Sequence, residues 1–188
     1  MPGESLTKGT IIMKQLKRNL ASFTTSTTAT AAIIFSLMLN VSAQAEEEAL
    51  SVSVVRLSSE SALIVAKAAM LECRKQGYQA TATVVDKNGI TQAVVRDTLA
   101  PPVSIEISKA KAYTSVNFTA DTSSMEALQN TPIGKFEGVL MSAGGVVINV
   151  GGIIYGAVGV SGAPSGVTDE NCAKAGVAAI SEELEMAD

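Results

Sequence analysis

Two lysines and a tyrosine, Lys109, Lys111 and Tyr113, are the side chains whose types and spacing best suit the binding of a small anion. They follow a loop with two prolines at 101–102, and Arg96 precedes that loop. Ammonium and guanidinium groups pair with carboxylates, and a phenol both donates and accepts hydrogen bonds. We interpret these residues as one side of a ligand cleft. The alternative is that the lysines are solvated surface residues, which is their commoner role.

Two other motifs have a structural and a functional interpretation. The glycine-rich segment 161–166 could present backbone N–H groups to an anion, or it could simply form turns. Glu182 and Glu185 stand at i and i+3 on one helical face, a spacing that could hold a hard metal ion weakly. A solvated acidic tail is the commoner interpretation of such a pair.

The chain contains no histidine, and this absence excludes many kinds of site. It removes the commonest general base, the commonest metal ligand and every Ser-His or Cys-His nucleophile. The two cysteines, Cys73 and Cys172, lack the CxxC spacing of zinc or thiol-exchange sites. Because they fall in the first and last predicted helices, which commonly pack together in a domain with one core, we expect them to form a disulfide in an oxidising compartment.

The N-terminal region has the pattern of a secretory signal. Basic residues, the last of them Arg18, precede an apolar run at 31–39, and the small residues of Ala43-Gln44-Ala45 follow it. The apolar run is far shorter than the ~20 residues that span a bilayer. We expect cleavage before Glu46, export to the periplasm or the medium, and no stable membrane insertion after processing. Translation starting at Met13 would leave this signal intact.

The remaining chain has the length of one domain. We assign residues 1–45 to the signal peptide, 46–56 to a short extension and 57–188 to the domain. The formal net charge is −4, and the domain has no basic run and no tryptophan. Nucleic acid is therefore not an expected partner, because its phosphates need a basic footprint.

The order of secondary structure predicts an α+β domain. Periodicity and capping signals predict helices at 58–76 and 104–117, a short helix at 123–129, and a last helix capped by Thr168. Runs at 80–85 and 91–96 form a hairpin around Asn88-Gly89, and runs at 146–150 and 153–160 form another around Gly151-Gly152. Hairpins flanked by helices indicate a layered domain with an antiparallel sheet rather than a doubly wound parallel sheet.

An ordered series of short segments across the domain resembles the GlcG/HbpS-like family of heme-binding and heme-degrading domains. The resemblance covers about 57–183. Its segments are Val84-Val85-Asp86-Lys87-Asn88-Gly89, Arg96-Asp97, Ser104-Ile105, Lys109-Ala110-Lys111-Ala112-Tyr113-Thr114, Gly144-Gly145-Val146, Gly156-Ala157-Val158-Gly159-Val160-Ser161-Gly162-Ala163 and Asp169-Glu170.

This resemblance implies a profilin-like or PAS-like fold that assembles into dimers or larger homo-oligomers. Some members are exported and bind heme, some are associated with heme breakdown or iron sensing, and others accompany glycolate or diol metabolism without a settled activity. By position, the functional segment would comprise Arg96-Asp97, Lys111, Tyr113 and Thr114, facing the glycine-rich hairpin.

The sequence departs from the family pattern at the expected site. Many relatives have Arg-Met-Asp-Gly where this chain has Arg96-Asp97-Thr98, and no histidine is present to bind iron. Without histidine, a heme iron would need Tyr, Met, Lys, Cys or a hydroxyl oxygen as its ligand, and we expect Tyr113 to supply an oxygen. We expect Arg96, Lys109 or Lys111 to meet the propionates.

The leading hypothesis is an exported, homo-oligomeric protein that binds heme or another anionic small molecule. Its rivals are an enzyme of heme breakdown or of small organic acids, and an accessory subunit without a ligand. Catalysis is therefore left open by the sequence.

Overall fold

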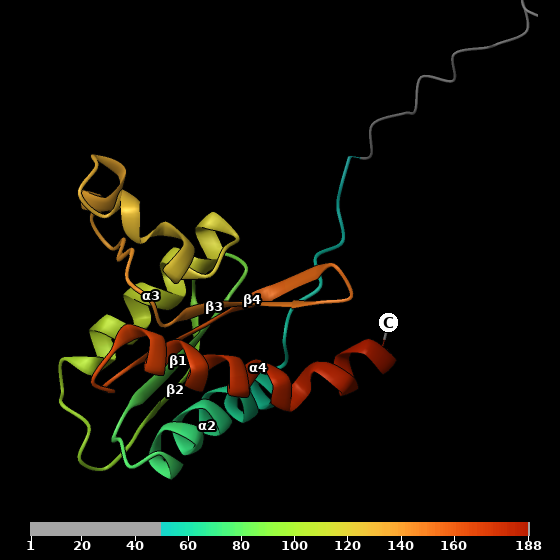
Figure 1. The fold of residues 1–188 in the computed structure, drawn as a ribbon. Helices are drawn as coiled ribbons and strands as arrows, with labels where there is room; N and C mark the ends of the chain where they lie inside the picture. The colour runs from blue at the N-terminus through green and yellow to red at the C-terminus, as the bar shows by residue number, and fades with distance from the viewer. Residues whose placement is uncertain (1–49, 188) are drawn as a thin grey trace, which may run out of the picture. The chain divides into compact units, whose positions relative to one another are not determined.

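The computed structural model describes residues 50–187, and its folded unit begins at Ser53. Four antiparallel strands form one sheet in the order β2-β1-β4-β3 (Figure 1). The strands are β1 (Thr81–Asp86), β2 (Thr91–Arg96), β3 (Gly145–Val150) and β4 (Ile153–Ser161). The predicted α+β class with an antiparallel sheet is confirmed.

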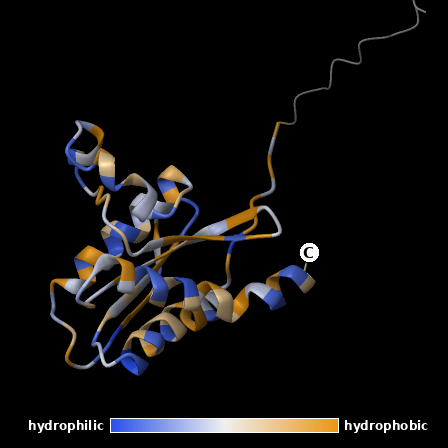
Figure 2. Cartoon of the chain, in the orientation of Figure 1, coloured by the Kyte–Doolittle hydropathy of each residue, from blue (hydrophilic) through white to orange (hydrophobic). Residues whose placement is uncertain are grey.

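Three helices cover the two faces of the sheet. α2 (Ser59–Lys75) and α4 (Gly166–Ala187) lie side by side on one face, and α3 (Ser104–Phe118) crosses the other (Figure 1). The strands alternate accordingly, since Val84 packs in the larger core with α2 and α4, whereas Val85 packs against α3. Figure 2 shows hydrophobic and hydrophilic residues alternating around α2 and α4, as expected for helices with one buried side.

Two predicted helix starts have different outcomes. The sequence offered Ser58 or Ser59 as the cap of α2, and Ser58 takes this role, because its hydroxyl accepts the backbone N–H of Ser61. The last helix begins at Gly166, before the predicted cap Thr168, and that cap assignment is wrong. Ser165 takes the role instead, since its Oγ accepts the N–H of Thr168 at 3.1 Å. Serine caps as well as threonine, so the sequence signal was misplaced by three residues.

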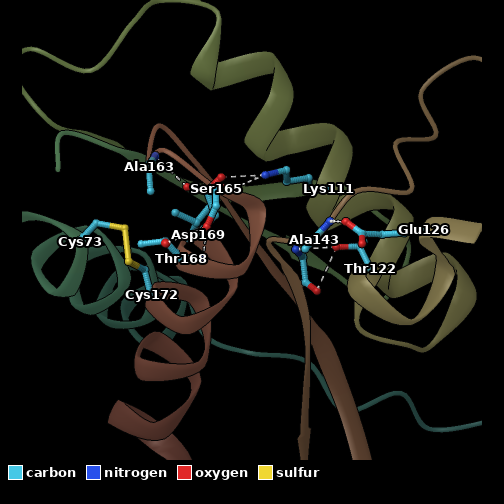
Figure 3. Close-up of polar contacts among 12 residues, drawn as sticks. Cys73, Lys111, Thr122, Glu126, Ala143, Ala163, Ser165, Thr168, Asp169 and Cys172 are labelled. Atoms are coloured by element: carbon cyan, nitrogen blue, oxygen red, sulfur yellow. Dashed lines mark hydrogen bonds and ion pairs between the residues drawn. A yellow bond between two sulfur atoms is a disulfide. The ribbon is translucent and has the colours of Figure 1, made fainter. Parts of the chain in front are cut away.

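The segment between α3 and β3 is more tightly wound than expected. The predicted short helix is the 3-10 helix η1 (Thr122–Leu128), and η2 (Ile133–Lys135) follows it. Two side chains of η1 fasten it to the start of β3: Thr122 Oγ1 accepts the N–H of Gly145 at 2.8 Å, and Glu126 accepts that of Ala143 at 2.9 Å (Figure 3).

Both predicted hairpins are present, with different turns. Gly151 and Gly152 have φ values of 60° and 85°, which is the pattern of a two-residue type I′ turn. In the first hairpin only Gly89 has a positive φ, 78°, and Asp86 Oδ1 accepts the N–H groups of Asn88 and Ile90. In β4, a Cβ on Gly159 would collide with the carbonyl oxygen of Ser108, so glycine permits the close approach of α3.

A disulfide joins α2 to α4, as the sequence predicted. Cys73 and Cys172 are bonded, with their Cα atoms 5.5 Å apart and a sequence separation of 99. Both cysteines lie in the larger hydrophobic core (Figure 3).

The predicted signal peptide and the first four residues of the extension lie outside the described residues. Among residues 50–187, no helix is long and apolar enough to cross a membrane.

Candidate functional site

A pocket of about 420 Å³ opens beside the solvent-facing side of α3. Four of its residues come from the helix at spacings of three, four and seven, which place them on one face. The other two come from the loop that follows η2. The lining residues are Glu106, Lys109, Ala110, Tyr113, Glu137 and Gly138.

Tyr113 is held in the pocket by two glycines from separate segments. A Cβ on Gly89 would lie 2.7 Å from Tyr113 Cδ2, and one on Gly138 would lie 3.9 Å from Tyr113 Cε1. The β1–β2 turn therefore packs directly against the tyrosine ring, and the loop carrying Gly138 approaches the ring as well. This packing fixes the ring while leaving the side chain half-buried.

The charges of the pocket are mixed. Lys109 is exposed and supplies the cation, whereas Glu106 and Glu137 supply two carboxylates. A ligand carboxylate would bind at the Lys109 side, because the two glutamates would repel it elsewhere. The pocket thus favours one orientation of an anionic ligand.

Lys111 points the opposite way from Lys109 and lies outside this pocket. Its side chain is 5 % exposed, and Nζ donates to Asp169 Oδ2 at 2.8 Å and to the carbonyl of Val160 at 3.1 Å (Figure 3). Gly144 makes room for this ammonium group, since a Cβ there would lie 2.6 Å from Nζ. To bind a ligand, Lys111 would have to leave a buried ion pair. Its ligand-binding role stays a prediction.

Asp169 also binds the glycine-rich segment 161–166 that precedes α4. Its Oδ1 accepts the backbone N–H of Ala163 at 2.9 Å, so a carboxylate of the chain itself occupies this donor. Burial raises the pKa of Asp169, although the ammonium of Lys111 acts in the opposite direction. The loop is therefore used for an internal contact between its backbone and α4.

Thr114 is fully buried behind the pocket. Its hydroxyl donates to the carbonyl of Ala110 at 2.8 Å and accepts the N–H of Leu140 at 2.8 Å. Direct ligand binding by Thr114, which the family resemblance implies, stays a prediction.

Arg96 and Asp97 lie at the end of β2, away from the residues that line the pocket. The exposed Arg96 side chain donates to the carbonyl of Ala100. Asp97 accepts from Nε and Nη2 of Arg74 at 2.8 and 2.6 Å. Hydrogen bonding from Arg74 lowers the pKa of Asp97 despite the opposing effect of burial. This pair joins α2 to β2, and a propionate-binding role for Arg96 stays a prediction.

No group of three or more acidic or cysteine side chains suited to a metal ion occurs among residues 50–187. Glu182 and Glu185 are both exposed near the end of α4.

Sequence reasoning missed four lining residues, Glu106, Ala110, Glu137 and Gly138. The helical spacing of Glu106 from Lys109 and Tyr113 was a usable signal. Glu137 and Gly138 come from a distant loop with no regular pattern, so only the tertiary structure places them here.

Fold and site together define a small α+β domain with a ligand-sized pocket on α3, and comparison with known proteins gives the family. The family model described as haem degrading protein HbpS-like matches residues 57–178. The chain belongs to this family, which confirms the resemblance seen in the sequence. A search of curated protein sequences found no match.

Solved structures support the same assignment. A double mutant of HbpS from Streptomyces reticuli is 34% identical, with a TM-score of 0.65, and the match covers 68% of this chain and 89% of that one. A complex of PduOC with heme is 25% identical, with a TM-score of 0.61 over 67% and 96% of the two chains. The Klebsiella pneumoniae protein ORFY, at 21% identity and a TM-score of 0.65 over 71% and 96%, shares the fold.

The donor set of the pocket fits heme in two respects. The phenol oxygen of Tyr113 is a type of group that ligates heme iron in proteins, and Lys109 can pair with a propionate. The volume lies toward the low end of the range of about 300–1,000 Å³ for small-molecule sites. Lys109 and Tyr113 are therefore the residues that would hold such a group here.

Proposed function

We propose that this chain is an exported binding protein that takes heme, or a related anionic small molecule, at the α3 pocket. The observation that carries the proposal is the presence of Lys109 and Tyr113 together on one face of α3, in a member of the HbpS-like family. When bound, heme would supply an iron centre and two propionates. Lys109 would orient the propionate edge, and Tyr113 would present its oxygen toward the metal.

Export and homo-oligomer formation complete the proposal. The signal pattern of residues 1–45 supports export, and the Cys73–Cys172 disulfide suits an oxidising compartment. The resemblance to the GlcG/HbpS-like family supports assembly into a homo-oligomer.

The experiment expresses the full chain in a bacterium and examines the periplasmic fraction. We expect an intact mass beginning at Glu46, and a Soret band that saturates at one hemin per chain. A mass that retains residues 13–45 in the processed fraction would contradict export. Absence of a Soret change with stoichiometric hemin would contradict heme as the ligand, and sedimentation of the loaded protein as a monomer would contradict assembly.

A second function, heme breakdown, is favoured by the description of the matching family. Incubation of the hemin complex in air with ascorbate as reductant distinguishes the two functions. A binding protein keeps its Soret band over the time in which free hemin controls are stable. Loss of the band with release of iron, at a rate that depends on protein concentration, would favour degradation.

A further inference from the structure

We propose that Thr114 is a positioning residue, whose hydroxyl holds the loop Phe136–Leu140 against α3 and so sets the shape of the ligand pocket. This inference rests on the proposed function for the ligand class. It gives Thr114 an indirect role that is distinct from direct ligand binding.

The hydroxyl of Thr114 acts as both a donor and an acceptor of hydrogen bonds within the protein. It donates to the carbonyl of Ala110 and accepts from the backbone N–H of Leu140, each at 2.8 Å, and the residue has no exposed surface. The first bond fixes the orientation of the hydroxyl, which aims a lone pair at the loop. Such a hydroxyl is better placed to hold the backbone than to meet a ligand in the pocket.

The loop that Thr114 holds forms one wall of the pocket. Glu137 and Gly138 both line it, and a turn closed by the N–H of Val139 and the carbonyl of Phe136, 3.0 Å apart, shapes the loop locally. Gly138 has a φ of 84°, a conformation that favours glycine. Within the described residues, the Leu140 bond is the hydrogen bond that joins this loop to α3.

The base of the same segment is closed separately. Glu126 accepts the N–H of Ala143, and Thr122 accepts that of Gly145 (Figure 3). These two bonds hold the chain to η1 at residues 143 and 145, where β3 begins. Loss of the Thr114 bond would therefore free the pocket wall without detaching β3. Glu137 and Gly138 would move, and Tyr113 would lose one of its two flanking glycines.

The variants are Thr114→Val, which keeps the shape and removes the hydroxyl, and Thr114→Ser, which restores it. Thr83→Val is the matched control, because Thr83 Oγ1 is equally buried under α3 and lies 2.8 Å from Ser108 Oγ, with no bond to the loop. The readouts are amide hydrogen exchange of residues 136–140 by NMR, hemin affinity, and thermal unfolding.

We expect Thr114→Val to speed exchange at Leu140 and its neighbours and to weaken hemin binding by about tenfold. Thr114→Ser should restore both, whereas Thr83→Val should lower stability and change neither. Unchanged exchange in Thr114→Val would overturn the inference, and so would faster exchange with unchanged hemin affinity.

Two further tests use amide exchange and hemin binding of the wild-type protein. If Leu140 exchanges as fast as an unprotected amide in the wild type, the inference fails, even when Thr114→Val does not fold. If the wild type binds no hemin while Thr114→Val still frees the loop, the proposed function fails and the positioning of the loop stands.

Discussion

Lys111 Nζ lies 2.8 Å from Asp169 Oδ2, and this ion pair joins α3 to α4 where β4 ends. Each side chain is 5 % exposed, and the carbonyl of Val160 accepts a further hydrogen bond from the ammonium. The pair thus connects the two layers of helices at the C-terminal end of β4, an inner strand of the sheet. A lysine that the sequence suggested as a ligand-binding residue has a clear structural contact.

Removing one partner of this pair should be costly. Asp169→Asn leaves the Lys111 charge buried without a counter-ion, so the free energy of unfolding should fall by about 3–5 kcal/mol. Lys109→Met on the exposed side of the same helix is the control and should change it by less than about 0.5 kcal/mol. Urea unfolding measures both. A cost for Asp169→Asn equal to that of the control would contradict the structural role.

The disulfide should contribute a comparable amount to the free energy of unfolding. Opening the bond between Cys73 and Cys172 by a Cys73→Ser/Cys172→Ser double substitution frees a loop of 99 residues. The chain-entropy estimate for such a loop is a loss of about 3–5 kcal/mol. Unfolding with and without reductant checks this prediction, because the reductant should affect only the wild type. Two free thiols in non-reduced exported protein would contradict the bond itself.

Asp97 should make stability depend on acid pH. Its folded pKa is lowered by hydrogen bonding from Arg74, whereas an unfolded aspartate has a pKa of about 3.9. Its contribution is therefore present above pH ~4 and is lost as the pH falls through the lowered folded value. Asp97→Asn should be less stable than the wild type at pH ~7 and lose less stability on acidification, measured by urea unfolding at several pH values. An identical pH slope in both proteins would refute this assignment.

Gly159 should tolerate no side chain. In Gly159→Ala the new methyl group would collide with the Ser108 carbonyl, so α3 must move and the cost should be about 3 kcal/mol or more. Gly152→Ala is the comparison, because nothing lies near its Cβ and the expected cost is the left-handed strain of about 1–2 kcal/mol. Thermal unfolding ranks the two variants, and an equal loss in both would argue against the close approach.

Most of the fold was predictable from local patterns. Periodicity predicted α2 and α3, a serine cap supported the start of α2 alone, and the glycine-containing turns predicted both hairpins. The start of α4 was misplaced because Ser165 and Thr168 are both acceptable caps, and their hydrogen-bonding partners depend on tertiary structure. The disulfide was predictable because a domain with one core brings its first and last helices together.

The candidate site was less predictable. Lys109 and Lys111 are two positions apart, so a helix of 3.6 residues per turn directs them to nearly opposite sides. That period alone could have separated them. The Asp169 partner and the contribution of Glu137 both depend on contacts between distant segments, which no local pattern in the sequence describes.

The most direct measurement of the central claim is a hemin titration of the purified protein, followed by Soret absorbance, in the wild type and three variants. We expect one hemin per wild-type chain, an affinity about tenfold or more weaker in Lys109→Ala, and an altered spectrum in Tyr113→Phe. Lys67→Ala, at an exposed position on α2, should match the wild type. Lack of saturable binding by the wild type, or affinities and spectra that are the same in all four proteins, would contradict heme binding at the α3 pocket.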